Sequence, residues 1–86
     1  MLRFRDSAFD HGIMEDQIEE VMANRWSMTK WFNIHDDGDG NSQDMAVGFD
    51  AEGTLLEIGF TYIDDDEVVF HADDMTPAWQ IKYNEG

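Results

Sequence analysis

The stretch MAVGFDAEGTLLEIGFTY, residues 45–62, decides the fold class of this chain. Apolar side chains occupy every second position on both sides of its central Asp-Ala-Glu-Gly segment, namely Met45, Val47 and Phe49 before it and Leu56, Ile58, Phe60 and Tyr62 after it. A period of two is typical of half-buried strands, and Asp and Gly are common turn residues. The stretch therefore predicts two antiparallel strands joined by a turn at residues 50–53.

Similar alternation on either side of this hairpin predicts three more strands. Their apolar positions are Leu2 and Phe4 in the first, Trp26, Met28, Phe32 and Ile34 in the second, and Val68, Phe70 and Ala72 in the third. Two acidic segments predict the turns between strands: residues 35–42, which contain two glycines, and residues 64–66, which are three aspartates. Trp31 lies on the polar side of its strand, so we expect it either to pack under a terminal helix with Trp79 or to mark a protein contact surface.

The remaining segments carry helix signals. Asp6 or Ser7 can cap a single helical turn that ends at Gly12, a residue that tolerates the left-handed conformation. A second helix begins near Glu15 and ends at Asn24. Its apolar face is Ile18, Val21 and Met22, and Ile13 and Ile18 are spaced as a hydrophobic staple. Thr76-Pro77 reads as N-cap and first residue of a last helix, in which Trp79 and Tyr83 lie one turn apart.

Together these elements predict one α+β domain over residues 1–86. A short N-terminal strand and a helix pair pack on an antiparallel meander of three to four strands, and a short C-terminal helix closes the chain. Because the turns between strands are of hairpin length, we expect the helices to cover one face or edge of an antiparallel sheet.

The charge of the chain restricts its partners. Twenty acidic residues against five basic ones give a formal net charge of −15. Phosphate backbones are bound by Lys and Arg, so the charge disfavours nucleic acid and an anionic membrane surface as partners. The acidity suits a basic protein partner or a high-salt environment. The chain has no cysteine and no run of apolar residues long enough to cross a membrane, so we expect a cytoplasmic protein.

Three residues are the candidates for catalysis: His71, His11 and Glu57. Histidine is the natural general acid or base near neutral pH. His71 lies inside a strand, and Glu57 on the preceding strand can face it. His11 precedes Gly12 at a helix end, where capping is the plainer role. His35 reads as a turn residue.

No metal or cofactor is expected. If Asp37, Asp39 and Asn41 are taken as the first calcium ligands of an EF-hand-like loop, the sixth position is Ser42 instead of Gly and the twelfth is Gly48 instead of Glu. The chain also has no phosphate-cradling glycine loop, no paired-His metal spacing and no Ser-His-Asp order.

In outline, most of the chain resembles small bacterial toxins of the BrnT type. The similarity is carried by His11-Gly12-Ile13 with the acidic helix that follows, by residues 48–57 as a central hairpin, and by Val68-Val69-Phe70-His71-Ala72 with Tyr83 near the end. The chain also looks like shorter uncharacterised actinobacterial relatives of that group. The resemblance implies a RelE-like ribonuclease-toxin fold and neutralisation by a DNA-binding antitoxin.

One departure from the family bears on function. Asp73 stands after Ala72, where such toxins tend to have Arg, and Asp74 follows it. We therefore expect a toxin-like domain that acts by binding a basic, antitoxin-like protein. One alternative is an active ribonuclease that uses His71 or His11 as base, with Arg3, Arg5 or Arg25 near the scissile phosphate. Another is an acidic mimic of nucleic acid. Homo-oligomer formation is left open.

Overall fold

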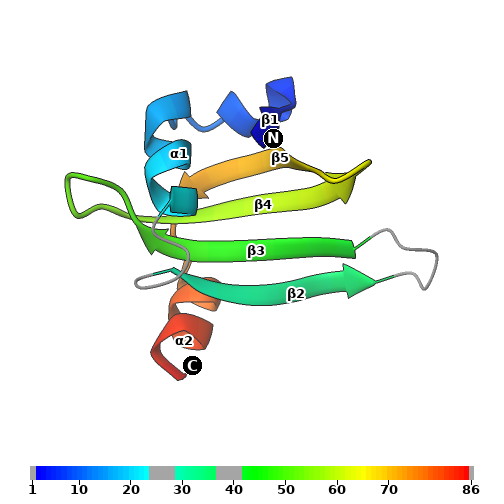
Figure 1. Cartoon of the computed structure of the whole chain (residues 1–86). Helices are drawn as coiled ribbons and strands as arrows, with labels where there is room; N and C mark the ends of the chain where they lie inside the picture. The colour runs from blue at the N-terminus through cyan, green and yellow to red at the C-terminus, as the bar shows by residue number, and fades with distance from the viewer. Residues whose placement is uncertain (1, 24–28, 37–41, 86) are drawn as a thin grey trace.

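The chain folds as an α+β protein, as the sequence predicts. The computed structural model describes residues 2–23, 29–36 and 42–85. The elements in order are β1 (Leu2–Phe4), the 3-10 turn η1 (Asp6–Phe9), α1 (Glu15–Ala23), β2 (Lys30–Asp36), β3 (Ser42–Phe49), β4 (Leu55–Ile63), β5 (Asp66–Asp74) and α2 (Pro77–Glu85) (Figure 1). No helix in the described ranges is long and apolar enough to span a membrane.

The sheet has five strands in the order β1-β5-β4-β3-β2. Strands β2 to β5 form the expected antiparallel meander, but β1 pairs in parallel with β5, so the sheet is mixed and larger than predicted. The backbone N–H of Arg5 extends this pairing by donating to the carbonyl of Val69 at 2.8 Å. Alternation within residues 2–4 indicates a strand, but it carries no information about a partner more than sixty residues away.

The first face of the sheet carries α1. Ile13 and Ile18 are both buried at the start of the helix, and the side-chain oxygen of Gln17 accepts the backbone N–H of Met14 at 2.9 Å. This hydrogen bond is half of a capping box, with the glutamine at the third helical position. Val21 and Met22 of the helix are buried in the same core, which also takes residues from η1, β3, β4 and β5: Ala8, Ala46, Leu56, Ile58, Phe60, Val69 and Ala72. Leu2 and Phe4 of β1 and Trp31 of β2 are partly buried and pack against it.

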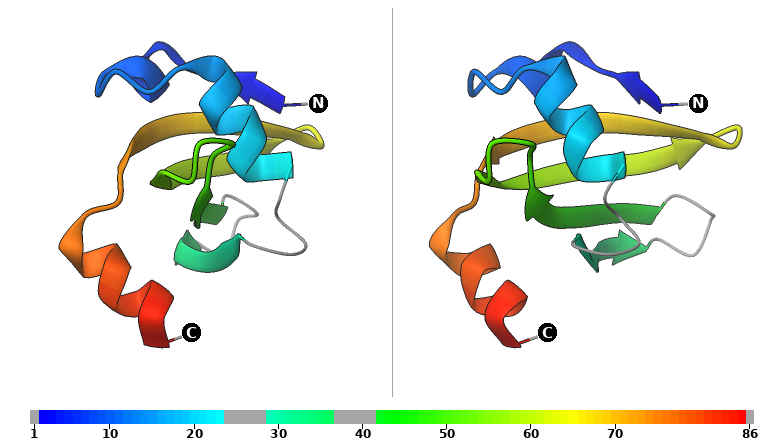
Figure 2. Two further views of the ribbon diagram at one scale, coloured as in Figure 1. Left: turned by 90° about the vertical axis from the view of Figure 1, so that its left-hand side faces the viewer. Right: turned by 60° about the vertical axis from the view of Figure 1, so that its left-hand side comes forward.

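The second face carries α2, so the expectation that the helices cover a single face is wrong (Figure 2). Trp79 packs on Phe32 with 5.6 Å between ring centroids, and Tyr83 packs on Phe49 at 6.3 Å. Successive strand residues point to opposite faces, and the apolar positions of β3 and β4 lie on different faces when the two strands pair. The sheet therefore has apolar residues to bury on both sides.

Three local predictions are also corrected. Trp31 packs on Phe60 in the first face, with 4.8 Å between ring centroids, instead of under α2 with Trp79. His35 lies in β2 and not in a turn. A register shift opposite Gly59 and Phe60 brings Val69 to the core, so Val68, Phe70 and Ala72 do not share one face of β5.

The hairpin turns agree with the sequence. Asp64 and Asp65 form the two-residue connection between β4 and β5, with positive φ angles of 51° and 71°. Asp66 then begins β5. The predicted strand positions Trp26 and Met28, and the turn residues 37–41 with the calcium ligands considered above, lie outside the described residues.

Candidate functional site

The three candidate catalytic residues lie together, although they come from distant parts of the chain. Glu57 on β4 and His71 on β5 are neighbours across the sheet, and Glu57 Oε2 lies 2.9 Å from His71 Nε2. Gly59 stands directly opposite His71 in the register. A Cβ at position 59 would lie 3.0 Å from the ring of Phe70 and 3.1 Å from the Cβ of His71, so the glycine leaves room for both neighbours.

Glu57 is a buried carboxylate with both oxygens in use. Only 3% of the residue is exposed. Its Oε1 accepts the backbone N–H of Thr76 at 2.7 Å, immediately before α2, while Oε2 contacts His71. Glu57 therefore joins β4, β5 and the start of α2. A buried carboxylate needs such partners, because leaving a buried charge unpaired is costly.

His11 completes the cluster from the loop after η1. Its ring centroid lies 5.4 Å from that of His71 in an edge-on arrangement, and its Nδ1 lies 3.6 Å from Asp73 Oδ2. Ser7 of η1 holds this loop against β5, just beyond the residues that pair with β1. Its hydroxyl donates to the carbonyl of Phe70 at 2.6 Å. The side chains of His11 and His71 are 47% and 29% exposed.

This arrangement has the elements of general acid–base chemistry: two solvent-accessible imidazoles, one of them oriented by a buried carboxylate. Among the described residues, no Lys or Arg forms an ion pair or a side-chain hydrogen bond with this cluster. Arg3 pairs with Asp66 at 3.5 Å, and Arg25 lies outside the described residues. Within the described part of the chain, no group of three or more His, Asp or Glu residues is arranged to hold a metal ion.

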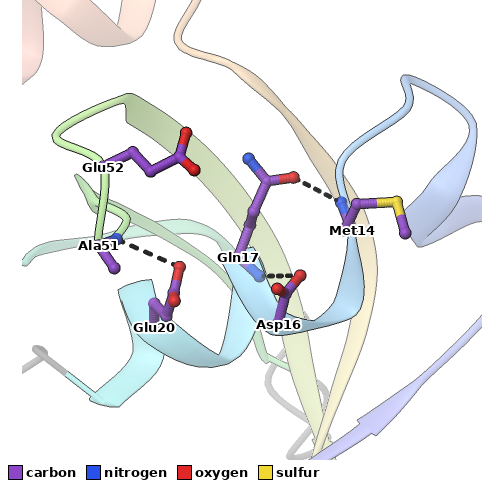
Figure 3. Close-up of a pocket in the computed structure, with 6 residues that line it drawn as sticks. All are labelled: Met14, Asp16, Gln17, Glu20, Ala51 and Glu52. Atoms are coloured by element: carbon purple, nitrogen blue, oxygen red, sulfur yellow. Dashed lines mark hydrogen bonds between the residues drawn. The ribbon is translucent and has the colours of Figure 1, made fainter.

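A pocket that sequence reasoning missed lies between α1 and the turn after β3 (Figure 3). Its volume is about 340 Å³, and its lining consists of Met14, Asp16, Gln17, Glu20, Ala51 and Glu52. Glu20 Oε1 accepts the backbone N–H of Ala51 at 3.1 Å, which ties the helix to the turn. Asp16 and Glu20 are four residues apart and so share one helix face, which is the signal in the sequence; the approach of Glu52 depends on the fold.

Asp50 holds together the wall of this pocket. Its Oδ2 accepts the side-chain N–H of Gln17 at 3.1 Å, and its Oδ1 accepts the backbone N–H groups of Glu52 and Thr54, each at 2.9 Å. The Gln17 hydrogen bond, followed by those from the backbone of Thr54, Glu52 and Gly53, lowers the pKa of Asp50 below its ordinary value of 3.8. These bonds favour the ionised carboxylate over the protonated acid.

Acid should therefore weaken the turn. A carboxyl group with a lowered pKa in the folded state contributes stability that is present above its unfolded pKa and is lost as the pH falls through the folded value. We expect Asp50→Ala to lower the melting temperature at pH 7 and to flatten the loss of stability below about pH 4. Thermal unfolding followed by circular dichroism from pH 7 to pH 2 measures both effects. Glu52→Ala, in the same turn but with an exposed side chain, is the control; equal effects of the two changes would contradict the role of Asp50.

No protein-family model matches this chain, and a search of the curated proteins finds no match.

Proposed function

We propose that this chain is a toxin-like acidic domain of a toxin–antitoxin type of system, and that it acts by binding a basic protein through the surface made by α1 and the turn at residues 50–54. The carrying observation is that Asp16, Glu20 and Glu52 line one pocket on this surface. A pocket with three carboxylates suits the Lys or Arg side chain of a partner, and charge complementarity steers association.

The distribution of cations supports the choice of this surface. From residue 6 to residue 24 the chain contains six carboxylates and no Lys or Arg, and Glu15, Asp16 and Glu19 on α1 are exposed. Elsewhere, Arg3 pairs with Asp66, and Lys30 donates a hydrogen bond to the carbonyl of Tyr83 while its ammonium lies 4.5 Å from that ring. Among the described residues, no cation forms an ion pair with the pocket carboxylates.

Neutralising the pocket tests the proposal. The combined variant Asp16→Asn, Glu20→Gln, Glu52→Gln removes three charges but keeps the oxygens that accept hydrogen bonds. We expect it to bind a synthetic Lys- and Arg-rich peptide about tenfold more weakly than the native chain at low salt. Titration calorimetry at increasing salt measures the effect, and native binding should weaken as salt screens the charges.

A matched control removes the same number of charges elsewhere. The variant Asp64→Asn, Asp65→Asn, Glu85→Gln changes exposed residues in the β4–β5 turn and at the end of α2, and asparagine tolerates the positive φ of the turn. We expect at most about a twofold change in affinity. Equal weakening in both variants would show that only net charge matters and would refute the pocket, and failure of the native chain to bind the peptide would refute the function.

The finer assignment to a BrnT-like toxin rests on the resemblance of His11-Gly12-Ile13, the central hairpin and the segment around His71. A five-stranded mixed sheet with two short helices is compatible with it. The natural partner of such a domain is a basic, antitoxin-like protein. Co-expression with a neighbouring small DNA-binding protein, followed by purification as a complex that dissociates at high salt, is the corresponding test.

A ribonuclease is the second candidate, because His71, His11 and Glu57 lie in one cluster. Against it, Asp73 contacts His11 and would repel a phosphate beside the imidazoles. Growth arrest on expression, together with RNA cleavage that is lost in His71→Asn and His11→Asn, would establish this activity. The nucleic-acid mimic has less support, because the described carboxylates come from several separate elements, among them α1, the β4–β5 turn and the end of β5.

A further inference from the structure

The long free edge of the sheet is β2. It pairs with β3 on one side, and no described residue pairs with its other side (Figure 1). The opposite edge is β1, which has only three residues and continues into η1. A free edge offers unpaired backbone N–H and C=O groups to another strand, and natural proteins usually shorten, cover or charge such edges.

Strand β2 carries a single acidic residue, Asp36 at its end. The segment from Val21 to His35 contains no Asp or Glu but includes two of the five basic residues, Arg25 and Lys30, although the whole chain has a net charge of −15. A basic partner protein is therefore attracted to other surfaces. Residues 30–35 of two antiparallel copies of β2, in contrast, can approach each other without bringing carboxylates face to face.

The geometry of β2 determines how two copies can pair. A register shift relative to β3 falls between Asn33 and His35, so Ile34 is a bulge and the regular part of the strand is residues 30–33. In an antiparallel pair with twofold symmetry, directly opposite residues lie on the same face of the sheet. A pairing centred on Phe32 uses only regular residues: Phe32 then faces its own copy, and Trp31 faces Asn33 of the second copy.

We propose that two copies of this chain form a weak homodimer by antiparallel pairing of β2 with β2, centred on Phe32. Aromatic residues opposite each other stabilise antiparallel strands. Phe32 already packs on Trp79 of α2, so the pair of Phe32 rings extends an existing aromatic cluster. A single strand pair is a small interface, and the two copies repel each other at long range, so the dimer forms at high protein concentration.

Dimerisation through β2 and binding of a basic protein should respond to salt in opposite ways, so the two proposals can be tested separately. Salt screens the repulsion between two copies of charge −15, so dimerisation should strengthen with salt, whereas binding of a basic protein should weaken. Analytical ultracentrifugation of the native chain measures dimerisation in low and in high salt. The protein concentration should reach the order of 100 µM, because the interface is weak. We expect the association constant to rise roughly tenfold between 0.05 M and 1 M salt, as the Debye length shrinks severalfold. A monomer under all these conditions would overturn the dimer and leave the proposed function untouched.

Cross-linking tests the position of the interface. The chain has no cysteine, so one introduced cysteine is its only thiol. Phe32→Cys would face its own copy at about 4.5 to 5.5 Å between Cα atoms, within the range of a disulfide. We expect mild oxidation in high salt to cross-link Phe32→Cys at least about tenfold faster than Ile63→Cys, which is 39% exposed at the β4–β5 hairpin. Equal rates would refute the edge pairing.

Hydrogen exchange on the native chain is a second test of the interface, and it does not depend on Phe32→Cys, which could disturb the packing of α2. In the native chain at high salt, the outward-pointing amides of residues 31–33 should exchange more slowly in concentrated than in dilute protein, because pairing protects them. Protection that does not change with concentration while the chain dimerises would place the interface elsewhere and overturn the proposal.

Discussion

Phe60→Ala is expected to lower the free energy of unfolding by about 3 to 5 kcal/mol, the usual cost of removing a buried aromatic ring. Phe60 is fully buried in the first face of the sheet, and its ring centroid lies 4.8 Å from that of Trp31 and 5.7 Å from that of Tyr62. A domain of this length has a total stability of about 4 to 13 kcal/mol. The variant should therefore melt about 12 to 40 °C lower or be unfolded at 37 °C.

Phe60→Leu is the matched control, because it keeps an apolar side chain and leaves a smaller cavity. We expect about half the loss of Phe60→Ala. Urea denaturation followed by tryptophan fluorescence measures both variants, and Trp31 beside the cavity reports the change directly. A loss below about 1 kcal/mol for Phe60→Ala would mean that the core can collapse around the missing ring, and would contradict the packing described for the first face.

Glu57→Ala is expected to cost about 3 kcal/mol, because it removes the shared acceptor of two donors. The backbone N–H of Thr76 loses its 2.7 Å partner, and His71 Nε2 loses its 2.9 Å partner. The start of α2 is then attached less firmly to the sheet. Thermal unfolding should show a melting temperature lower by about 12 to 24 °C.

Glu57→Gln separates the hydrogen bonds from the charge. The amide oxygen still accepts the N–H of Thr76, and the amide N–H₂ can donate to the other tautomer of His71, so we expect a loss of only about 1 kcal/mol. A double-mutant cycle with His71→Ala gives the coupling between the two side chains. Coupling near zero, together with equal losses in Glu57→Ala and Glu57→Gln, would show that the contact contributes nothing to stability.

Phe60 and Glu57 differ in how much of their structural role can be predicted from the sequence. Phe60 is predictable as core from its alternation with Gly59 and Thr61, because a strand buries every second side chain. The helix starts are equally local: Ile13 with Ile18, and Thr76 with Pro77, are patterns within a few residues of chain. For these features the observed helices and strands agree with the predictions.

The role of Glu57 is different. Nothing near it in the chain indicates that a carboxylate at this position is 3% exposed, because its two partners lie 14 and 19 residues further on. That Glu57 can face His71 was predictable from a hairpin register. That His11 lies against His71, and that Thr76 takes the second oxygen of Glu57, depends on how η1 and α2 fold back on β5.

The sequence by itself determined the α+β class, an antiparallel meander of three to four strands, the helix starts and the strong acidity, because each depends on composition or on neighbours along the chain. Only the tertiary structure decided the parallel pairing of β1 with β5, the helices on opposite faces, the His11–His71–Glu57 cluster and the pocket beside α1. The physical reason is that periodicity shows which side of an element is apolar, whereas the partner of that side depends on which distant surfaces bury it best.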